Sequence, residues 1–397
     1  MSDSAPTAGQ NIQVLRKTLG WGQEHLARRM GISASLLRKI EDGTRTATPP
    51  TVAQAAKAMG VSTARIYGTP FSDPGEAQGL LDALRLTVRR HTLPREDVPA
   101  LDKLAAGLAE AAQLRADTRY LELLRKLPKL LEQASAVALQ AGGDATAWGQ
   151  LADLYGCAYA VTHRLGQADL SDMIVSRQQW AAQRTWNPEA EAGAAWNEAG
   201  TYQSAGEYSD GLAIVDRAIV RYEQGGRTDT PEAAVALGSL HLRGVVLASR
   251  AKDHNAWAAH HEHAKAFAER FPGGDVLRHN LTFGPGNTAL YELAAHVELG
   301  RPDRASEMAE PLMRTPPAGL GASRIGRLCI DTARARLDLN DIRGAEAALK
   351  RAHEVAPQMA EVHPMAREVL RVLFILHQRS RPDLINLAKR SGLMPEL

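Results

Sequence analysis

Apolar residues in the first 67 positions recur every three or four residues, the spacing that buries one side of a short helix. The pattern predicts helices at about 12–19, 23–30 and 33–41. Gly31 falls between the second and third, where only glycine enters a left-handed turn without a Cβ penalty. Two short helices are therefore expected to cross steeply there. The expected buried positions are Leu15, Leu26, Ile32, Leu37 and Ile40.

Helix-ending and helix-starting residues extend this unit to Tyr67. Ser33 stands where an N-cap is expected and Gly43 follows the last periodic residue. Val52, Ala56 and Met59 mark a fourth helix that Gly60 ends, and Ser62 caps a short fifth one. We therefore expect a flexible N-terminus over 1–10, a five-helix domain over 11–67, a linker rich in proline and glycine over 68–78, and a second domain over 79–397.

The second domain reads as helix almost throughout, without a run of strand-like alternation. Turn-like sequences occur at Gly166, Gly206, Ala251, Gly300 and Asn340, spaced 40 to 49 residues apart. This period predicts about five helix pairs between roughly 150 and 357, preceded by helices over 80–140 and closed by a helical pair over 361–393. The predicted fold class is all-α: a five-helix domain followed by a helical-repeat solenoid.

Charge is unevenly distributed along the chain. The 397 residues carry a net charge of +2, but residues 1–67 contain nine Lys or Arg against four Asp or Glu. A basic head on a mildly acidic body favours nucleic-acid binding by the head alone. Cys157 and Cys329 are too few and too scattered for a disulfide framework or zinc cage. With no signal peptide and no membrane-spanning apolar run, we expect a cytoplasmic protein with reduced thiols.

The polar face of the third helix is the best candidate for base contacts. Ala34, Ser35, Arg38 and Lys39 share the side opposite Leu37. That side is small near the helix start and cationic further on, which suits a helix that enters the major groove by its N-terminal end. The alternative is that Arg38 and Lys39 are ordinary solvated charges. Further cations, Arg16, Lys17, Arg28, Arg29 and Arg45, are expected to contact phosphates or simply to lie on the surface.

The first 67 residues resemble the XRE (Cro/phage-repressor-type) helix-turn-helix family. The matching residues are Gln23 and Leu26-Ala27, then Gly31-Ile32-Ser33 at the turn and Ile40-Glu41-Asp42-Gly43 at the exit. The resemblance implies that Gln23 binds a phosphate and that Ala34, Ser35 and Arg38 face base edges. Leu36 departs from the usually polar residue at its place and either touches a thymine methyl or belongs to the core. The predicted DNA-contacting set is Gln23, Ser33, Ala34, Ser35, Leu36, Arg38, Lys39, Arg45, Arg16 and Lys17.

The body resembles degenerate tetratricopeptide repeats, and the whole chain resembles RRNPP peptide-sensing regulators and actinobacterial XRE regulators with helical-repeat C-termini. In such a solenoid the first helix of each pair lines the concave surface. Asn197 and Asn287 are then the best candidates for recognising a peptide backbone, with Trp196 and Tyr291 as apolar walls. The alternative is that these residues pack the solenoid or face water. The predicted ligand-contacting set is Asn197, Trp196, His241, Asn287, Tyr291, Arg327, Asp331 and Arg334.

Other motifs point away from catalysis. Five histidines lie close together between His254 and His279, but no consistent cysteine or acidic pattern joins them, so no metal site is expected. The stretch Phe283-Gly-Pro-Gly-Asn287 lacks the strand and lysine of a phosphate loop, and Pro285 instead marks the first turn of a helix. We expect no enzyme and no cofactor.

These patterns predict a transcriptional regulator. A homodimer would bind a near-palindromic double-stranded DNA operator, and a peptide or small-molecule effector in the concave face would control it. In one alternative the repeat domain serves only dimerisation or protein docking. In another, the chain is an interaction scaffold that no longer binds DNA. No membrane partner is expected.

Overall fold

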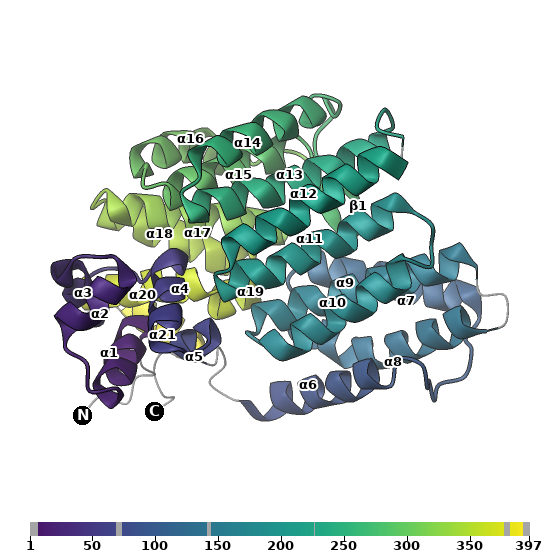
Figure 1. The fold of residues 1–397 in the computed structure, drawn as a ribbon, viewed down its shortest axis with the longest axis horizontal. Coiled ribbons are helices and arrows are strands. Elements are labelled where there is room, and N and C mark those ends of the chain that lie inside the picture. The colour runs from purple at the N-terminus through teal and green to yellow at the C-terminus, as the bar shows by residue number, and fades with distance from the viewer. Residues whose placement is uncertain (1–6, 69–73, 141–143, 226, 377–381, 392–397) are drawn as a thin grey trace.

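Helices make up nearly all of this chain. The computed structural model describes residues 7–68, 74–140, 144–225, 227–376 and 382–391. Within those ranges the chain forms 21 helices and a single two-stranded sheet (Figure 1). The predicted all-α class, with a small helical head and a helical-repeat body, is confirmed.

The head consists of five helices, as predicted. Gly31 adopts a left-handed conformation with φ 68° between the second and third, and the hydroxyl of Ser62 caps the fifth. The helices are α1 (Ala8–Thr18), α2 (Gln23–Met30), α3 (Ala34–Glu41), α4 (Pro49–Met59) and α5 (Thr63–Tyr67).

The helix α1 begins earlier than the sequence predicted. Thr7 and Gln10 form a capping box, in which each side chain bonds the backbone N–H of the other residue. The expectation of a flexible N-terminus over 1–10 is therefore wrong for 8–10, which are helical, while 1–6 lie outside the described residues. The predicted linker, 68–78, is likewise shortened: 69–73 lie outside the described residues and the next helix begins at Pro74.

Three helices precede the repeats of the body. They are α6 (Pro74–Arg89), α7 (Leu101–Ala116) and α8 (Tyr120–Leu139). Five helix pairs follow, as the turn spacing predicted. The pairs are α9 (Ala145–Arg164) with α10 (Ala168–Ala182), α11 (Pro188–Ala205) with α12 (Tyr208–Gly225), α13 (Pro231–Ala251) with α14 (His254–Ala268), α15 (Pro285–Glu298) with α16 (Pro302–Arg314), and α17 (Ala322–Asp338) with α18 (Ile342–Val355).

Each predicted turn ends the first helix of a pair in a left-handed conformation. The residues with positive φ at these five ends are Gly166, Gly206, Lys252, Gly300 and Asn340. The first helices then pack side by side in chain order, from α9 to α17. The short helix α19 (Pro357–Val362) leads into the predicted closing pair, α20 (Pro364–Leu376) and α21 (Pro382–Arg390).

A β-hairpin, which the sequence did not predict, interrupts the repeats between α14 and α15. Its strands are β1 (Val276–Arg278) and β2 (Leu281–Phe283), paired antiparallel with Val276 opposite Phe283. His279 and Asn280 both have positive φ at the tip, as a tight two-residue hairpin turn requires. The Phe283 ring packs onto Gly238 of α13, where any Cβ would lie 2.0 Å from it.

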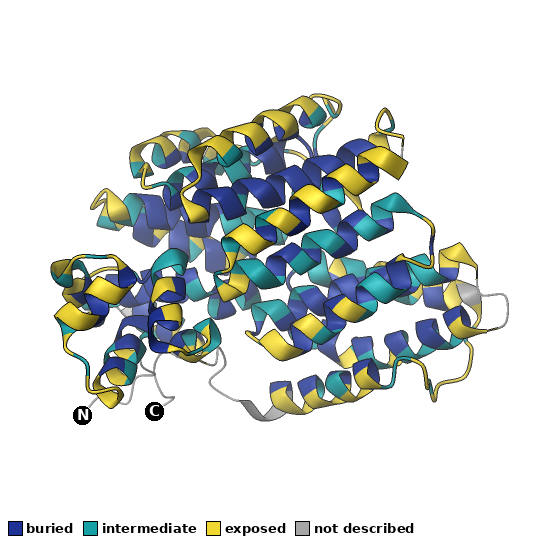
Figure 2. Cartoon of the chain, viewed as in Figure 1, coloured by how far each residue is buried: buried dark blue, intermediate teal, exposed yellow. Residues whose placement is uncertain are grey.

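The body and the head have separate hydrophobic cores. The head core contains most of the apolar residues expected there, including Leu26, Leu37 and Ile40, with Leu15 and Ile32 packed at its edge. In the body α13 is buried along nearly its whole length (Figure 2). It is therefore the central helix around which neighbouring pairs pack.

The head is docked against the end of the body and against the second repeat. The backbone N–H of Ala8 donates to Glu368 Oε1 of α20 at 3.3 Å. The hydroxyl of Thr63 donates to the carbonyl of Ser204 on α11 at 2.8 Å, and Gly206 lies so close to α4 that a Cβ there would be 2.3 Å from that of Ala53. Segments from the middle of the chain and from near its C-terminus thus hold the head.

Candidate nucleic-acid interface and ligand site

The turn between α2 and α3 sets the direction of α3. Ser33 caps this helix, because its hydroxyl accepts the backbone N–H of Leu36 at 3.1 Å. Leu37 and Ile40 are fully buried on the opposite side. The helix is therefore held rigidly by its apolar face, and its other face is free to meet a partner.

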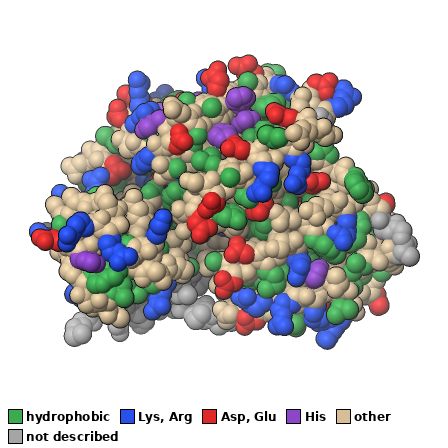
Figure 3. All heavy atoms as spheres, in the orientation of Figure 1, with side chains coloured by type: hydrophobic (Ala, Val, Ile, Leu, Met, Phe, Trp, Pro, Cys, Tyr) green, Lys and Arg blue, Asp and Glu red, His purple; other side chains and the backbone are tan. Residues whose placement is uncertain are grey.

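The exposed face of α3 carries the predicted base-contacting residues. Ser35, Arg38 and Lys39 are exposed and Ala34 is half-buried at the helix start. Leu36 is half-buried and packs against the head core. Of its two predicted roles, contact with a thymine methyl or membership of the core, its position matches the second. On the surface drawn in Figure 3, Lys and Arg side chains lie on the head, left in the view, whereas histidines gather over α14 at the top.

One predicted phosphate contact is wrong. Arg16 is buried and forms a bidentate ion pair with Glu41, with Nε–Oε1 and Nη2–Oε2 distances of 2.7 Å, and it also donates to the carbonyl of Trp21. Gln23 Nε2 donates to the same Glu41 at 2.7 Å. Burial alone would raise the pKa of Glu41, but the hydrogen bonds from Arg16 and Gln23 outweigh it and lower that pKa. This buried network joins α1, α2 and α3.

The other predicted phosphate-binding cations are exposed. Lys17 lies on α1 and Arg29 stacks over the ring of Trp21 at 4.7 Å. Arg45, just after α3, forms an ion pair of 3.6 Å with Asp338 at the end of α17. One cation beside the recognition face thus also contacts the body.

Comparison with known families agrees with this geometry. The stretch from 8 to 66 matches the family model described as a helix-turn-helix domain. Residues 8–66 are a helix-turn-helix DNA-binding domain. The match covers α1 to α5, which are the five helices of the head.

Two solved structures are similar to longer parts of the chain. One is PlcR from Bacillus thuringiensis, in complex with the peptide PapR7 and DNA, at 17% identity and a TM-score of 0.33, covering 67% of this chain and 96% of that one. The other is a mutant of PrgX, at 8% identity and a TM-score of 0.26, covering 96% of this chain and 100% of that one. No curated protein sequence matches the chain.

Three of the predicted ligand-contacting residues meet in the body. Trp196, Asn287 and Tyr291 line a pocket between α11, α13, β2 and α15, together with Arg324 of α17, and the pocket is too narrow to hold a water molecule. The Asn287 amide donates to the carbonyl of Thr282 at 2.6 Å, while its buried Oδ1 has no partner among the described residues. One acceptor is therefore unsatisfied beside the pocket.

The three predicted residues of α17 form a buried charge network. Asp331 accepts from Arg327 at 2.6 Å and from Arg334 at 3.0 Å, and Arg334 also donates to Glu298 of α15 at 3.0 Å. Arg250 of α13 lies 3.6 Å from the same Glu298. Burial would raise the pKa of Glu298, but Arg334 and Arg250 outweigh it and lower that pKa to about 2.

His241 and Asn197 do not lie where the sequence predicted. His241 packs between α13 and α14, with Nδ1 3.0 Å from that of His260 and its ring stacked on His263. Burial lowers the pKa of His241 to about 3, so the ring is neutral and belongs to this helix–helix contact. Asn197 is buried and donates to Gln178 Oε1 of α10 at 2.7 Å. Its amide is thus occupied by an internal bond.

The described residues contain no group of three or more His, Cys, Asp or Glu placed to hold a metal ion. Across the same residues, no helix combines the length and apolarity needed to cross a bilayer.

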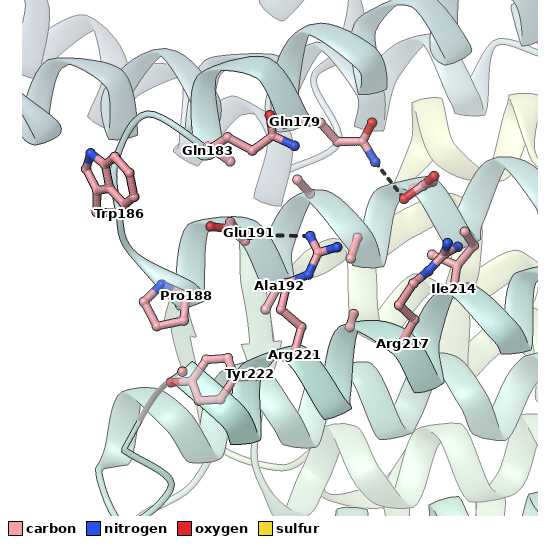
Figure 4. A pocket seen from close by; sticks show the side chains of 16 residues that line it. Gln179, Gln183, Trp186, Pro188, Glu191, Ala192, Ile214, Arg217, Arg221 and Tyr222 are labelled. Carbon is pink, nitrogen blue, oxygen red and sulfur yellow. Dashed lines mark hydrogen bonds and ion pairs between the residues drawn. The ribbon is translucent and has the colours of Figure 1, made fainter.

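The hairpin tip and a hollow on α11 are features that sequence reasoning missed. Asn280 donates to the carbonyl of Asp153 on α9 at 2.8 Å, and His279 Nδ1 lies 3.4 Å from the Asp153 carboxylate. A cavity of about 500 Å³ between α10, α11 and α12 has the 91% exposed Trp186 at its rim. Figure 4 shows Arg221 reaching Glu191 across this cavity. Only the tertiary packing brings these residues together.

Proposed function

We propose that this protein is a dimeric, sequence-specific transcriptional regulator whose DNA affinity is controlled by a ligand held among the first helices of its repeats. The proposed DNA binding rests on the exposed face of α3. Ser35, Arg38 and Lys39 lie there, opposite a buried apolar side. In a dimer, two such helices about 34 Å apart would enter successive major grooves.

The docking of the head onto the body supports the second part of the proposal, which is that a ligand controls DNA affinity. Thr63, Arg45 and Ala8 contact α11, α17 and α20, so the head touches both the second repeat and the end of the solenoid. A ligand that favours one packing of the repeats would therefore change the placement of the head. It can do so only as far as it binds the two arrangements with different affinity.

A DNA shift assay with Arg38→Ala tests the proposal, with operator candidates taken from DNA selected by the full-length protein. We expect affinity to fall by about 1–3 kcal/mol if Arg38 contacts a base edge bidentately. Lys57→Ala is the matched control, since Lys57 is an exposed cation on α4 away from α3. Equal affinity of the wild type and Arg38→Ala would remove the helix-turn-helix from the function and favour the scaffold alternative.

A further inference from the structure

Four arginines from four different helices converge inside the body. Arg115 ends α7, Arg164 ends α9, Arg243 lies midway along α13 and Arg324 begins α17. Arg243 is buried and the other three are half-buried. They come from positions far apart in sequence, so only the stacking of the repeats brings them together.

Contacts with aromatic side chains place two of these arginines, Arg243 and Arg324, around a shared centre. The Arg243 guanidinium stacks 3.6 Å above the Trp196 ring, and its Nη1 donates to Gln203 Oε1 at 2.6 Å. Arg324 Nη1 donates to the Tyr291 hydroxyl at 3.4 Å. The Tyr159 hydroxyl lies beside Arg243 as well, because a Cβ on Gly200 would lie 2.1 Å from that hydroxyl and 3.2 Å from Arg243 Nη2.

The arginines are close enough to act on one another electrostatically. Burial lowers the pKa of Arg164 and Arg243, and the neighbouring arginines lower it further. Burial raises the pKa of Tyr291, yet Arg324 and Arg243 outweigh burial and bring it below its ordinary value. The centre therefore carries a positive potential, which stabilises negative charge placed among these side chains.

Acidic side chains near the cluster are already engaged elsewhere. Asp331 pairs with Arg327 and Arg334, and Glu298 pairs with Arg334 and Arg250. Asp153 faces His279 at the hairpin tip, and the buried Asp275 accepts the backbone N–H of Asn287. These two carboxylates attract Arg115 and Arg324, respectively, but neither forms an ion pair with them. Among the described residues, no carboxylate pairs with any of the four arginines of the cluster, and the buried Nε atoms of Arg115 and Arg243 have no acceptor.

We propose that Arg115, Arg164, Arg243 and Arg324 form a binding site for an anionic ligand carrying phosphate or carboxylate groups. Guanidinium forks match the geometry of both groups and hold them through charge-assisted hydrogen bonds. Four such groups, none of them ion-paired with a carboxylate among the described residues, fit a ligand with more than one negative charge. This inference rests on the proposed function, because it assigns a chemical class to the ligand that the repeats hold.

The test uses full-length protein and three probes: inorganic pyrophosphate, citrate, and a hexapeptide of aspartate with an asparagine hexapeptide as its neutral partner. Binding is measured by calorimetry and by thermal unfolding, against sodium chloride of matched ionic strength. We expect at least one anionic probe to raise the unfolding temperature, because a ligand that binds only the folded state stabilises it.

Variants show whether the anion binds at the cluster. Arg324→Gln and Arg164→Gln are each expected to weaken probe binding about tenfold or more, through loss of one charge-assisted bond. Each is also expected to raise the unfolding temperature of the unliganded protein, since a repelling charge is removed. Arg304→Gln, on the exposed surface of α16, is the control and should change neither quantity.

The outcomes separate the sources of the anion and the two proposals. Stabilisation by the acidic peptide alone indicates a peptide ligand, and stabilisation by pyrophosphate or citrate alone indicates a small phosphate or carboxylate ligand. The anion site is refuted if no probe acts beyond the chloride control, or if both cluster variants keep wild-type affinity. DNA binding is measured separately with Arg38→Ala. Failure of the anion site would therefore not contradict the proposal that the protein is a DNA-binding regulator.

Discussion

Arg16 and Glu41 show how a single buried pair holds the head together. Both side chains are almost fully buried and share two hydrogen bonds, and Gln23 donates a third hydrogen bond to the Glu41 carboxylate. Removing one partner of such a pair leaves an uncompensated buried charge. Under the proposed function, Arg16 and Glu41 would therefore contribute to DNA recognition by positioning α3.

Arg16→Ala is expected to destabilise the head by about 3–5 kcal/mol, the usual cost of breaking a buried ion pair. Hydrogen exchange of the α1 and α3 amides in the full-length protein measures this local loss. Lys17→Ala is the control, because Lys17 is the exposed neighbour on the same helix. Similar protection in both variants would mean that the buried pair contributes nothing to the fold of the head.

For single residues, the sequence predicted features that depend on neighbouring positions and missed contacts between residues far apart in the chain. The cap at Ser33, the turn at Gly31 and the exposed face of α3 depend on residues within one or two helical turns, and all three are confirmed. Arg16 looked like a free cation because its partner lies 25 positions away. His241 was misplaced because a helix exposes several faces, and only its neighbours decide which one meets α14.

The hairpin between α14 and α15 is the element that departs most from the repeat pattern. It packs through Phe283 on α13 and reaches α9 through Asn280, so it ties the first and third repeats together. Three-residue strands leave almost no alternation to read in a sequence, which explains why the period of the turns was predictable and this insertion was not.

Substituting Gly238 tests how tightly the hairpin is held. Gly238→Ala would place a Cβ 2.0 Å from the Phe283 ring, so the hairpin must shift, and we expect a loss of about 1–3 kcal/mol by overpacking. The matched control is Gly149→Ala on α9, whose Cβ would have no neighbour closer than 3.9 Å. That change should instead stabilise its helix by about 0.5–1 kcal/mol. Thermal unfolding measures both, and equal shifts of the same sign would contradict the close packing.

The stability of the whole molecule depends on ion pairs that are buried where neighbouring repeats meet. Glu298 pairs with Arg334 and Arg250, and its pKa falls to about 2 from an ordinary value of 4.5. A carboxyl with a lowered folded-state pKa stabilises the fold above its unfolded pKa, and the contribution is lost as pH falls through the folded value. This contribution is therefore full above about pH 4.5 and disappears towards pH 2.

Comparison of wild type with Glu298→Gln isolates that contribution. At neutral pH the variant is expected to be the less stable protein, because Arg250 loses its ion pair with Glu298 and Arg334 keeps only the one with Asp331. The difference in unfolding temperature should shrink as pH is lowered from 4.5 towards 2, since the wild-type carboxyl then becomes neutral as well. A difference that stays constant over this range would show that Glu298 remains ionised or unpaired.

Docking of the head is a property of the entire chain. Glu368 of α20 accepts the first N–H of α1, and Arg371 donates to the same carboxylate at 2.7 Å. Glu368→Ala is expected to speed hydrogen exchange across residues 8–18 while leaving α3 protected by its own core. Glu310→Ala, which removes an exposed ion pair on α16, serves as the control. Unchanged exchange in the Glu368 variant would mean that other contacts suffice to hold α1.

The contact between α1 and α20 has a consequence for the order in which the protein is made. Roughly 300 residues separate the head from α20, and chains grow at about 5–20 residues per second, so the head is complete for roughly 15–60 s before its docking partner exists. During that interval the head has a core of its own and the full DNA-facing side of α3, but no α20 against which to dock. Under the proposed function, a chain that stalls within the repeats would present a DNA-binding head without the element that restrains it.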